Sequence, residues 1–227
     1  MKALILAGGR GVRLRPETDQ TPKPMLHVQN KPILEHTISM LPDIISEIFI
    51  VTGWLGSHIK DHFGNEFKNK KIFYLEQTEP KGTFHALSLG KDFLNEEPFL
   101  IISGDDLYSA IDLKNVCEKE SAVLVHKTDN PERFGICKKG EDGFLHKIIE
   151  KPKEFVGNLA NIGVYKLRPT IFEEEIVVGS SGEQVLAPMI GNLAQKEKIA
   201  LVEATFWHPI ADINDLDKAQ NLDLKYK

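Results

Sequence analysis

The sequence has little cysteine, and this scarcity excludes two kinds of stabilised domain. Two cysteines, Cys117 and Cys137, occur among 227 residues, in separate segments and without a CxxC spacing. Neither a disulfide framework nor a cysteine-based metal site is therefore expected. This usage fits a reducing compartment, and we expect a cytoplasmic protein.

The sequence also lacks long apolar runs and a surplus of positive charge. No stretch approaches the roughly 20 apolar residues that span a bilayer, and Met1-Lys2 lead into a strand-like run rather than a cleavable signal. The formal net charge is -5, with Lys and Arg spread along the chain, whereas general polyanion binders usually carry a basic surplus on one face. We therefore expect neither a membrane partner nor a nucleic-acid partner.

The chain does contain enough apolar material for a substantial core, since 41% of its residues are hydrophobic. Five apolar runs are continuous rather than alternating, as in strands that are covered on both faces: 3–7, 48–51, 72–75, 99–102 and 122–125. Segments with helical spacing lie between or after these runs: 33–41, 84–94, 185–193 and 215–224. This alternation predicts an α/β fold with a Rossmann-like, doubly wound, mostly parallel mixed sheet.

The pattern changes after about residue 130. Residues 134–137 and 144–149 flank a turn from Gly140 to Gly143, which predicts a hairpin and hence a small antiparallel elaboration in the second half. The chain contains no obvious linker, repeat or low-complexity tract. We therefore expect one domain over residues 1–227.

A glycine-rich segment follows the first strand. Gly8, Gly9 and Gly11 would let backbone N–H groups approach a phosphate at the ligand-binding edge of an open α/β sheet. The segment lacks the Gly-Lys-Ser/Thr ending of a Walker loop, and Leu14 stands where the dinucleotide pattern needs a third glycine. Four cations accompany the glycines, and they predict a polyphosphate ligand: Arg10, Arg13, Arg15 and Lys23.

The alternative for this segment is a tight turn between strand and helix, with solvated basic side chains. Lys23 argues against it, because Pro22 and Pro24 restrict the backbone on both sides of the lysine. A lysine that is held in place suits the stabilisation of charge in a transition state.

The run LILAGGRGVRLRPETDQTPKPML, followed by Asn30-Lys31-Pro32, closely resembles the signature of the sugar-phosphate nucleotidylyltransferases. The resemblance implies that the loop wraps a nucleoside triphosphate, and that Arg13 and Lys23 are catalytic, stabilising the negative charge at the α-phosphorus. It implies nucleotide contacts from Leu6, Ala7, Gly8, Gly9 and Gly11. Val12 departs from the threonine usual in the family.

Carboxylates for a Mg²⁺ ion are predicted at two places. Asp105, in Ser103-Gly104-Asp105-Asp106, follows an apolar run and resembles the first aspartate of the family's Gly-Asp-x metal element. Asp212, in the segment 207–213, resembles the aspartate of a Trp-x-Asp-hydrophobic-Gly element, with stretched spacing and Asn214 in place of glycine. The alternative for Asp212 is an N-cap or turn aspartate before the last helix.

Recognition of the two substrates is implied by the same resemblance. The family's base-contacting positions match Gln77, Gly82 and Thr83, and its sugar-phosphate elements match Gly135, Glu150, Lys151 and Asn161. Without the resemblance, Gln77 would be a surface residue, Gly82-Thr83 the start of a helix and Glu150-Lys151 a solvated charge pair. Three histidines have no metal-ligand spacing and are interpreted as structural or surface residues: His85, His126 and His208.

The expected reaction joins a nucleoside triphosphate to a sugar 1-phosphate, with Mg²⁺ as cofactor, by direct in-line displacement without a covalent enzyme intermediate. The compact length resembles stand-alone uridylyltransferases, and we favour a pyrimidine nucleotide; Gly8-Gly9 resembles thymidylyl- and guanylyltransferases. Two alternatives are a guanylyltransferase for a mannose- or heptose-type 1-phosphate and a non-catalytic nucleotide-sugar sensor. A monomer or small homo-oligomer is expected, and base and sugar remain open.

Overall fold

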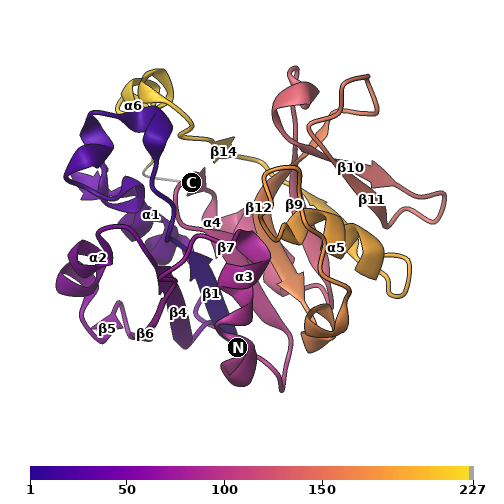
Figure 1. The fold of residues 1–227 in the computed structure, drawn as a ribbon, viewed down its shortest axis with the longest axis horizontal. Coiled ribbons are helices and arrows are strands. Elements are labelled where there is room, and N and C mark those ends of the chain that lie inside the picture. The colour runs from indigo at the N-terminus through magenta and orange to yellow at the C-terminus, as the bar shows by residue number, and fades with distance from the viewer. Residues whose placement is uncertain (225–227) are drawn as a thin grey trace.

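The computed structural model describes residues 1–224 and is built around a ten-stranded mixed sheet (Figure 1). Its main path has the order β11-β10-β12-β7-β1-β4-β6-β5, and β9 joins β12 on one side and β13 on the other. The strands are β1 (Lys2–Leu6), β4 (Glu47–Thr52), β5 (Glu66–Phe67), β6 (Lys70–Glu76), β7 (Phe99–Ser103), β9 (Ala122–Lys127), β10 (Gly135–Lys139), β11 (Leu145–Glu150), β12 (Leu159–Leu167) and β13 (Ala200–Glu203). Two short antiparallel pairs stand apart: β2 (His27–Val28) with β3 (Lys31–Pro32), and β8 (Leu107–Tyr108) with β14 (Trp207–His208).

The parallel half of the sheet consists of β7, β1, β4 and β6, whose strands all run in one direction. Strand β12 runs antiparallel to β7, β9 and β10, and the hairpin of β10 and β11 extends this antiparallel region. The prediction of a doubly wound, mostly parallel sheet with an antiparallel elaboration in the second half is therefore confirmed.

Helices cover both faces of the sheet, which explains why the strands read as continuous apolar runs. The helices are α1 (Ile33–Met40), α2 (Gly56–Phe63), α3 (Thr83–Ser88), α4 (Ala110–Cys117), α5 (Leu186–Leu193) and α6 (Ile213–Ala219). Along β1, Ala3 and Ile5 pack in a core with α1, α2 and α4, whereas Leu4 packs in a second core with α3 and α5. In Figure 1, α3 and α5 lie in front of the strands.

The helix expected over 84–94 is shorter than predicted. Helix α3 ends at Ser88, and a separate 3-10 turn follows at Lys91–Phe93. Gly90 lies between them against β1, where an added Cβ would stand 2.7 Å from Leu4 Cδ1. Gly90 therefore packs on the Leu4 side chain, where little room is left for a side chain of its own.

The last helix also differs from its predicted range of 215–224, since α6 begins at Ile213 and ends at Ala219. It packs on the N-terminal segment, and Figure 1 shows its yellow ribbon beside indigo ribbon. Gln29 and Gln220 join the two segments, the backbone N–H of Gln29 donating to Gln220 Oε1 at 2.9 Å. Residues 225–227, which complete the range of the predicted domain, lie outside the described residues.

No helix within residues 1–224 has both the length and the apolar content needed to cross a bilayer.

Candidate functional site

The site is built at one edge of the sheet, where the parallel strands β1, β4, β6 and β7 end. Hydrogen bonds hold the chain together just past these ends: Ala7 N donates to Val51 O at 3.0 Å, Gly104 N to Leu6 O at 2.9 Å, and Gln77 N to Thr52 O at 2.8 Å. The glycine loop after β1, Asp105 after β7 and Gln77 after β6 therefore all leave the sheet at the same edge. Clustered strand ends are the usual place for ligands in an open α/β sheet.

Three adjoining cavities open at this edge. The loop cavity is lined by Leu6, Ala7, Gly9, Gly11, Val12, Arg13, Leu14, Lys23, Pro24, Asp105 and Ala211. The α3 cavity includes Leu6, Gly8, Gly9, Arg10, Gln77, Pro80, Gly82, Thr83, Ala86, Asp105, Glu183 and Val185. The hairpin cavity includes Arg13, Lys23, Asp105, Asp106, Arg133, Gly135, Glu150, Lys151, Asn161, Tyr165, Trp207, Pro209 and Ala211. Asp105 lines all three, so it marks the point where they meet.

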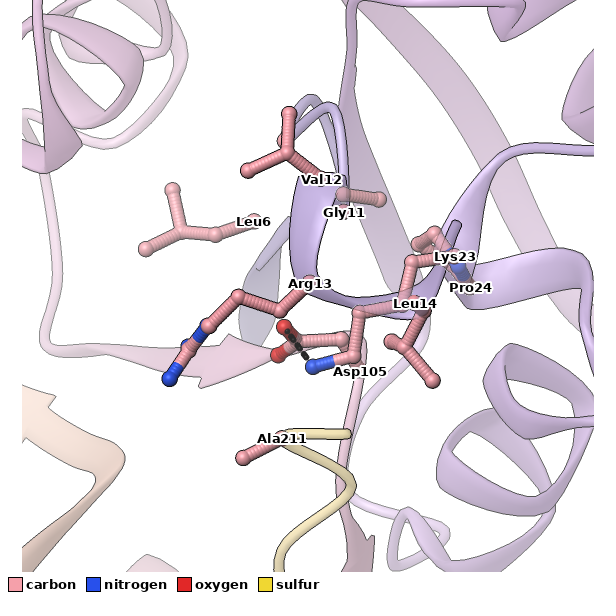
Figure 2. A pocket seen from close by; sticks show the side chains of 11 residues that line it. Leu6, Gly11, Val12, Arg13, Leu14, Lys23, Pro24, Asp105 and Ala211 are labelled. Atoms are coloured by element: carbon pink, nitrogen blue, oxygen red, sulfur yellow. Dashed lines mark hydrogen bonds and ion pairs between the residues drawn. The ribbon is translucent and has the colours of Figure 1, made fainter. Parts of the chain in front are cut away.

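Lys23 and Asp105 form an ion pair at that meeting point, with Nζ 2.6 Å from Oδ2. The lysine side chain is 11% exposed and the aspartate side chain 38%, so the ammonium is held in place while the carboxylate still reaches solvent. Figure 2 shows the pair as a dashed line, with Arg13 extending beside the carboxylate and Val12 turned away from it. Val12, the departure from the family pattern, is 57% exposed.

Gly11 explains how Lys23 comes so close to the loop. Its φ of 61° lies in the left-handed region, and an added Cβ would stand 2.9 Å from the Cβ of Lys23. The Thr18 hydroxyl donates to Gly11 O at 2.9 Å and fixes the same turn. A side chain at position 11 would therefore strain the backbone and displace Lys23.

The other two arginines of the segment have separate positions. The Arg10 guanidinium lies over the Trp54 ring, 5.5 Å from its centroid, and Arg10 lines the α3 cavity. Arg15 Nε pairs with Asp19 Oδ1 at 3.1 Å, and both side chains are exposed. The predicted group of cations therefore reaches the cavities through Arg10, Arg13 and Lys23, whereas Arg15 is paired outside their linings.

Asp106 anchors the C-terminal segment to the site, a role that was not predicted from the sequence. Its Oδ1 accepts from Ile210 N at 3.0 Å and its Oδ2 from Trp207 Nε1 at 3.1 Å. The pKa of Asp106 is raised to about 6, mainly because the carboxyl is withdrawn from water and secondly because Asp105 is negatively charged. Lys23 and the two hydrogen bonds act in the opposite direction and lower this pKa. The sequence contains part of the information for this role, because the indole N–H of Trp207 can only donate and needs an acceptor when it is buried.

Asp212, the expected second metal ligand, caps α6. Its Oδ1 accepts from Asp215 N at 3.1 Å, while Asp215 Oδ2 accepts from Ala211 N at 3.0 Å. Pro209 and Ala211 line the hairpin cavity, and Asp212 is not among the lining residues. The carboxylate therefore has the capping role considered as its alternative, and its metal role stays a prediction. Within residues 1–224, no group of three or more His, Cys, Asp or Glu side chains is arranged to hold a metal ion.

The residues expected to recognise a base line the α3 cavity. Gln77 Nε2 donates to Gly82 O at 3.2 Å and lies 2.9 Å from His85 Nδ1. Thr83 Oγ1 accepts from Leu186 N at 3.0 Å, so this hydroxyl also joins α3 to the start of α5. His85, interpreted from the sequence as a structural or surface residue, thus touches a side chain of the cavity wall.

The residues expected to bind a sugar phosphate line the hairpin cavity. Gly135 and Glu150 are partners in the β10–β11 ladder, and a Cβ added at Gly135 would stand 2.9 Å from Glu150 Oε2. The exposed Lys151 Nζ lies 3.9 Å from Glu150 Oε1. Asn161 Nδ2 donates to Tyr165 Oη at 2.7 Å, which fixes the orientation of the amide. This cavity therefore offers a lysine, a carboxylate and an amide opposite the glycine loop.

Known proteins resemble this chain over three quarters of its length or more. A Methanococcus vannielii bifunctional protein GlmU is 35% identical over 99% of this chain and 55% of its own length, so the chain spans about half of that relative. The Haloferax volcanii UTP–glucose-1-phosphate uridylyltransferase AglF is 36% identical over 76% of this chain and 74% of its own. A crystallised Bacillus anthracis protein assigned as a glucose-1-phosphate thymidylyltransferase superposes with a TM-score of 0.87 at 27% identity, covering 100% of this chain and 96% of its own.

The match to a protein family is equally extensive, because the family model described as Nucleotidyl transferase covers residues 2–225. It includes the glycine loop, Asp105, the α3 segment and the hairpin. The resemblance to the sugar-phosphate nucleotidylyltransferases is therefore confirmed, and this chain belongs to the nucleotidyl transferase family.

Proposed function

We propose that this chain transfers a nucleoside monophosphate from a nucleoside triphosphate to a sugar 1-phosphate, releasing pyrophosphate. The observation that carries the proposal is the position of Asp105, which lines three cavities at once. The glycine loop and α3 offer room for a nucleotide on one side of it, and Lys151 and Glu150 offer contacts for a second, anionic substrate on the other. Two substrates would meet where Lys23 is held.

In the proposed reaction, an oxygen of the sugar phosphate attacks the α-phosphorus of the triphosphate. The bond from that phosphorus to the oxygen bridging to the β-phosphate breaks, and its electron pair leaves with pyrophosphate. Because both reactants are anions, catalysis consists mainly of holding them in line and offsetting their charge. Arg13 and Lys23 are the catalytic cations, and Lys151 orients the acceptor phosphate.

The donor set around Asp105 fits a Mg²⁺ ion. This ion favours oxygen ligands and commonly keeps several waters and substrate phosphate oxygens, so it needs few protein carboxylates. Asp105 has a half-exposed carboxylate at the meeting of the cavities and would hold the ion, which would polarise the phosphoryl oxygens. Lys23 occupies that carboxylate at 2.6 Å in this structure, so the lysine would exchange this contact for substrate phosphate.

The nucleotide is proposed to carry a pyrimidine, with a guanine nucleotide as the alternative. A uridylyltransferase name among the relatives and a thymidylyltransferase assignment among the structures support this preference. The reaction is proposed to take place in the cytoplasm, in keeping with two buried, unpaired cysteines.

Pyrophosphate release tests the proposal, measured with five nucleoside triphosphates crossed with several hexose 1-phosphates in the presence of Mg²⁺. We expect release only when both substrates are present, with the NDP-sugar formed in equal amount. Tight nucleotide binding without release in any combination would favour the sensor instead and would refute transfer.

A further inference from the structure

The side-chain amide of Gln77 is held in one orientation at the end of β6. Its Nε2 lies 3.2 Å from Gly82 O and 2.9 Å from His85 Nδ1. A backbone carbonyl can only accept, so the group that faces Gly82 must be the amide nitrogen. The second proton of the same nitrogen then points to His85.

This arrangement also determines the state of the imidazole ring. Because Gln77 Nε2 can only donate, His85 Nδ1 must carry a lone pair, and the ring proton of the neutral form lies on Nε2. His85 lies in the first turn of α3, half-buried beside the cavity wall. The ring and the Gly82 carbonyl thus engage both N–H bonds of the amide.

The amide oxygen points toward the glycine loop. Gly8 belongs to the glycine loop, and a Cβ added there would stand 3.4 Å from Gln77 Oε1. Gly8, Gln77 and Gly82 all line the α3 cavity. Oε1 is thus placed beside the glycine loop at the wall of this cavity, while both N–H bonds of the amide are engaged by Gly82 O and His85 Nδ1.

We propose that His85 is a positioning residue for base selection: with the Gly82 carbonyl, it locks Gln77 so that Oε1 faces the nucleotide. This inference rests on the proposed function and deepens it by naming the class of base. Uracil and thymine carry a ring N–H at N3, and guanine carries one at N1, and each can donate to a fixed acceptor. Cytosine and adenine have a lone pair at the equivalent ring nitrogen, which would face Oε1 unfavourably. Without these two contacts, the amide could rotate by about half a turn and present Nε2 to the base, so that both kinds of base could bind.

The test compares kcat/KM for UTP and CTP in the wild-type protein, His85→Phe and His85→Asn. We expect the wild type to favour UTP by on the order of tenfold or more, as one well-made hydrogen bond against an unfavourable lone-pair contact allows. His85→Phe keeps a ring but loses the acceptor, so most of this preference should disappear through a higher KM for UTP rather than a lower kcat. His85→Asn can place Oδ1 near the position of Nδ1 and should restore the preference.

The control is His58→Phe, the same substitution at an exposed histidine on α2 that lines none of the three cavities. It should leave the UTP-to-CTP ratio unchanged. A wild-type ratio in His85→Phe, or loss of the ratio in His85→Asn with a native melting temperature, would overturn the positioning role. A wild-type protein that prefers CTP or ATP would overturn the base class while leaving transfer intact.

Failure of the proposed function would give a different result, namely no pyrophosphate with any triphosphate. In that case, equilibrium binding of UTP and CTP, measured by calorimetry on the same variants, still decides whether His85 controls base selection. Equal affinities of the wild type for UTP and CTP would then refute the inference.

Discussion

Gly82→Ala should destabilise the fold strongly, although it adds only one methyl group. Gly82 has φ 104° and ψ 179°, a backbone region that is almost confined to glycine. An added Cβ would stand 2.7 Å from Gln184 N and 3.0 Å from Gln184 C, and closer still to the carbonyl oxygen. The substitution therefore combines backbone strain with a clash against backbone, which cannot rotate away as a side chain could.

The size of the effect follows from these two causes. Strain at such a position costs about 1–3 kcal/mol. Relief of the clash would separate Gln184 from its neighbours and break two hydrogen bonds, Gln184 N to Lys81 O at 2.8 Å and Phe84 N to Gln184 O at 3.0 Å. Each contributes roughly 1 kcal/mol net, so the free energy of unfolding should fall by about 3–5 kcal/mol. For a chain of this size, that loss lowers the melting temperature by roughly 6–20 °C.

Thermal unfolding of three glycine variants separates strain from clash. Gly64 also has a positive φ, 58°, but an added Cβ would meet nothing within 4 Å, so Gly64→Ala reports strain alone. Gly9 has neither feature, and Gly9→Ala should change stability by less than about 0.5 kcal/mol. We expect the melting temperatures to fall in the order Gly9→Ala, Gly64→Ala, Gly82→Ala. Equal melting temperatures for the Gly82 and Gly64 variants would refute the close contact with Gln184.

Three other predictions concern the site and the thiols. Lys23→Ala should lower turnover by roughly 100-fold or more, as for other groups that stabilise transition-state charge, while nucleotide affinity changes far less; unchanged turnover would remove Lys23 from catalysis. Asp212→Ala should lower the free energy of unfolding, measured by denaturant titration, by about 1 kcal/mol because α6 loses its N-cap. A large drop in the affinity for Mn²⁺ would instead establish Asp212 as a metal ligand. Burial raises the pKa of Cys117 to about 11 and that of Cys137 to about 12, so both thiols should be protonated at pH 8. Both should therefore react with iodoacetamide far more slowly in the folded protein than in 6 M guanidinium. Similar rates in the two conditions would contradict their burial.

The sequence pattern predicts those parts of the fold in which the local preference of a segment agrees with its packing in the folded chain. Strands β1, β4, β6 and β7 read as apolar runs because helices cover both faces, and the hairpin of β10 and β11 follows from its turn. The early end of α3 could not be read in the same way. The chain after Ser88 packs through Gly90 on Leu4, and these two residues are far apart in the sequence.

The same distinction applies to the candidate site. The long N-terminal motif predicted the lining positions of the loop itself, from Leu6 to Lys23, whereas the lining positions after β6 and in the hairpin came from separate motifs. The resemblance to a stretched motif predicts Asp212 as a metal ligand, although Asp215 three residues later is a local sign of a helix start. The contact between Gln77 and His85 crosses the junction between β6 and α3. Neither the strand period nor the helix period indicates which side chains meet across such a junction.

The order of the parallel strands has a consequence for how such a protein can diverge. Gln77 follows β6, whereas the glycine loop follows β1, and β4 lies between them. At about 4.8 Å per strand, the segment proposed to contact the base therefore starts roughly 10 Å from the loop proposed to bind the phosphates. We therefore expect substitutions after β6 to change the nucleotide preference while Lys23, Arg13 and Asp105 keep their positions. The proposed base contacts and the proposed catalytic residues thus come from different strands, and we expect each set to be alterable, by natural variation or by design, without rebuilding the other.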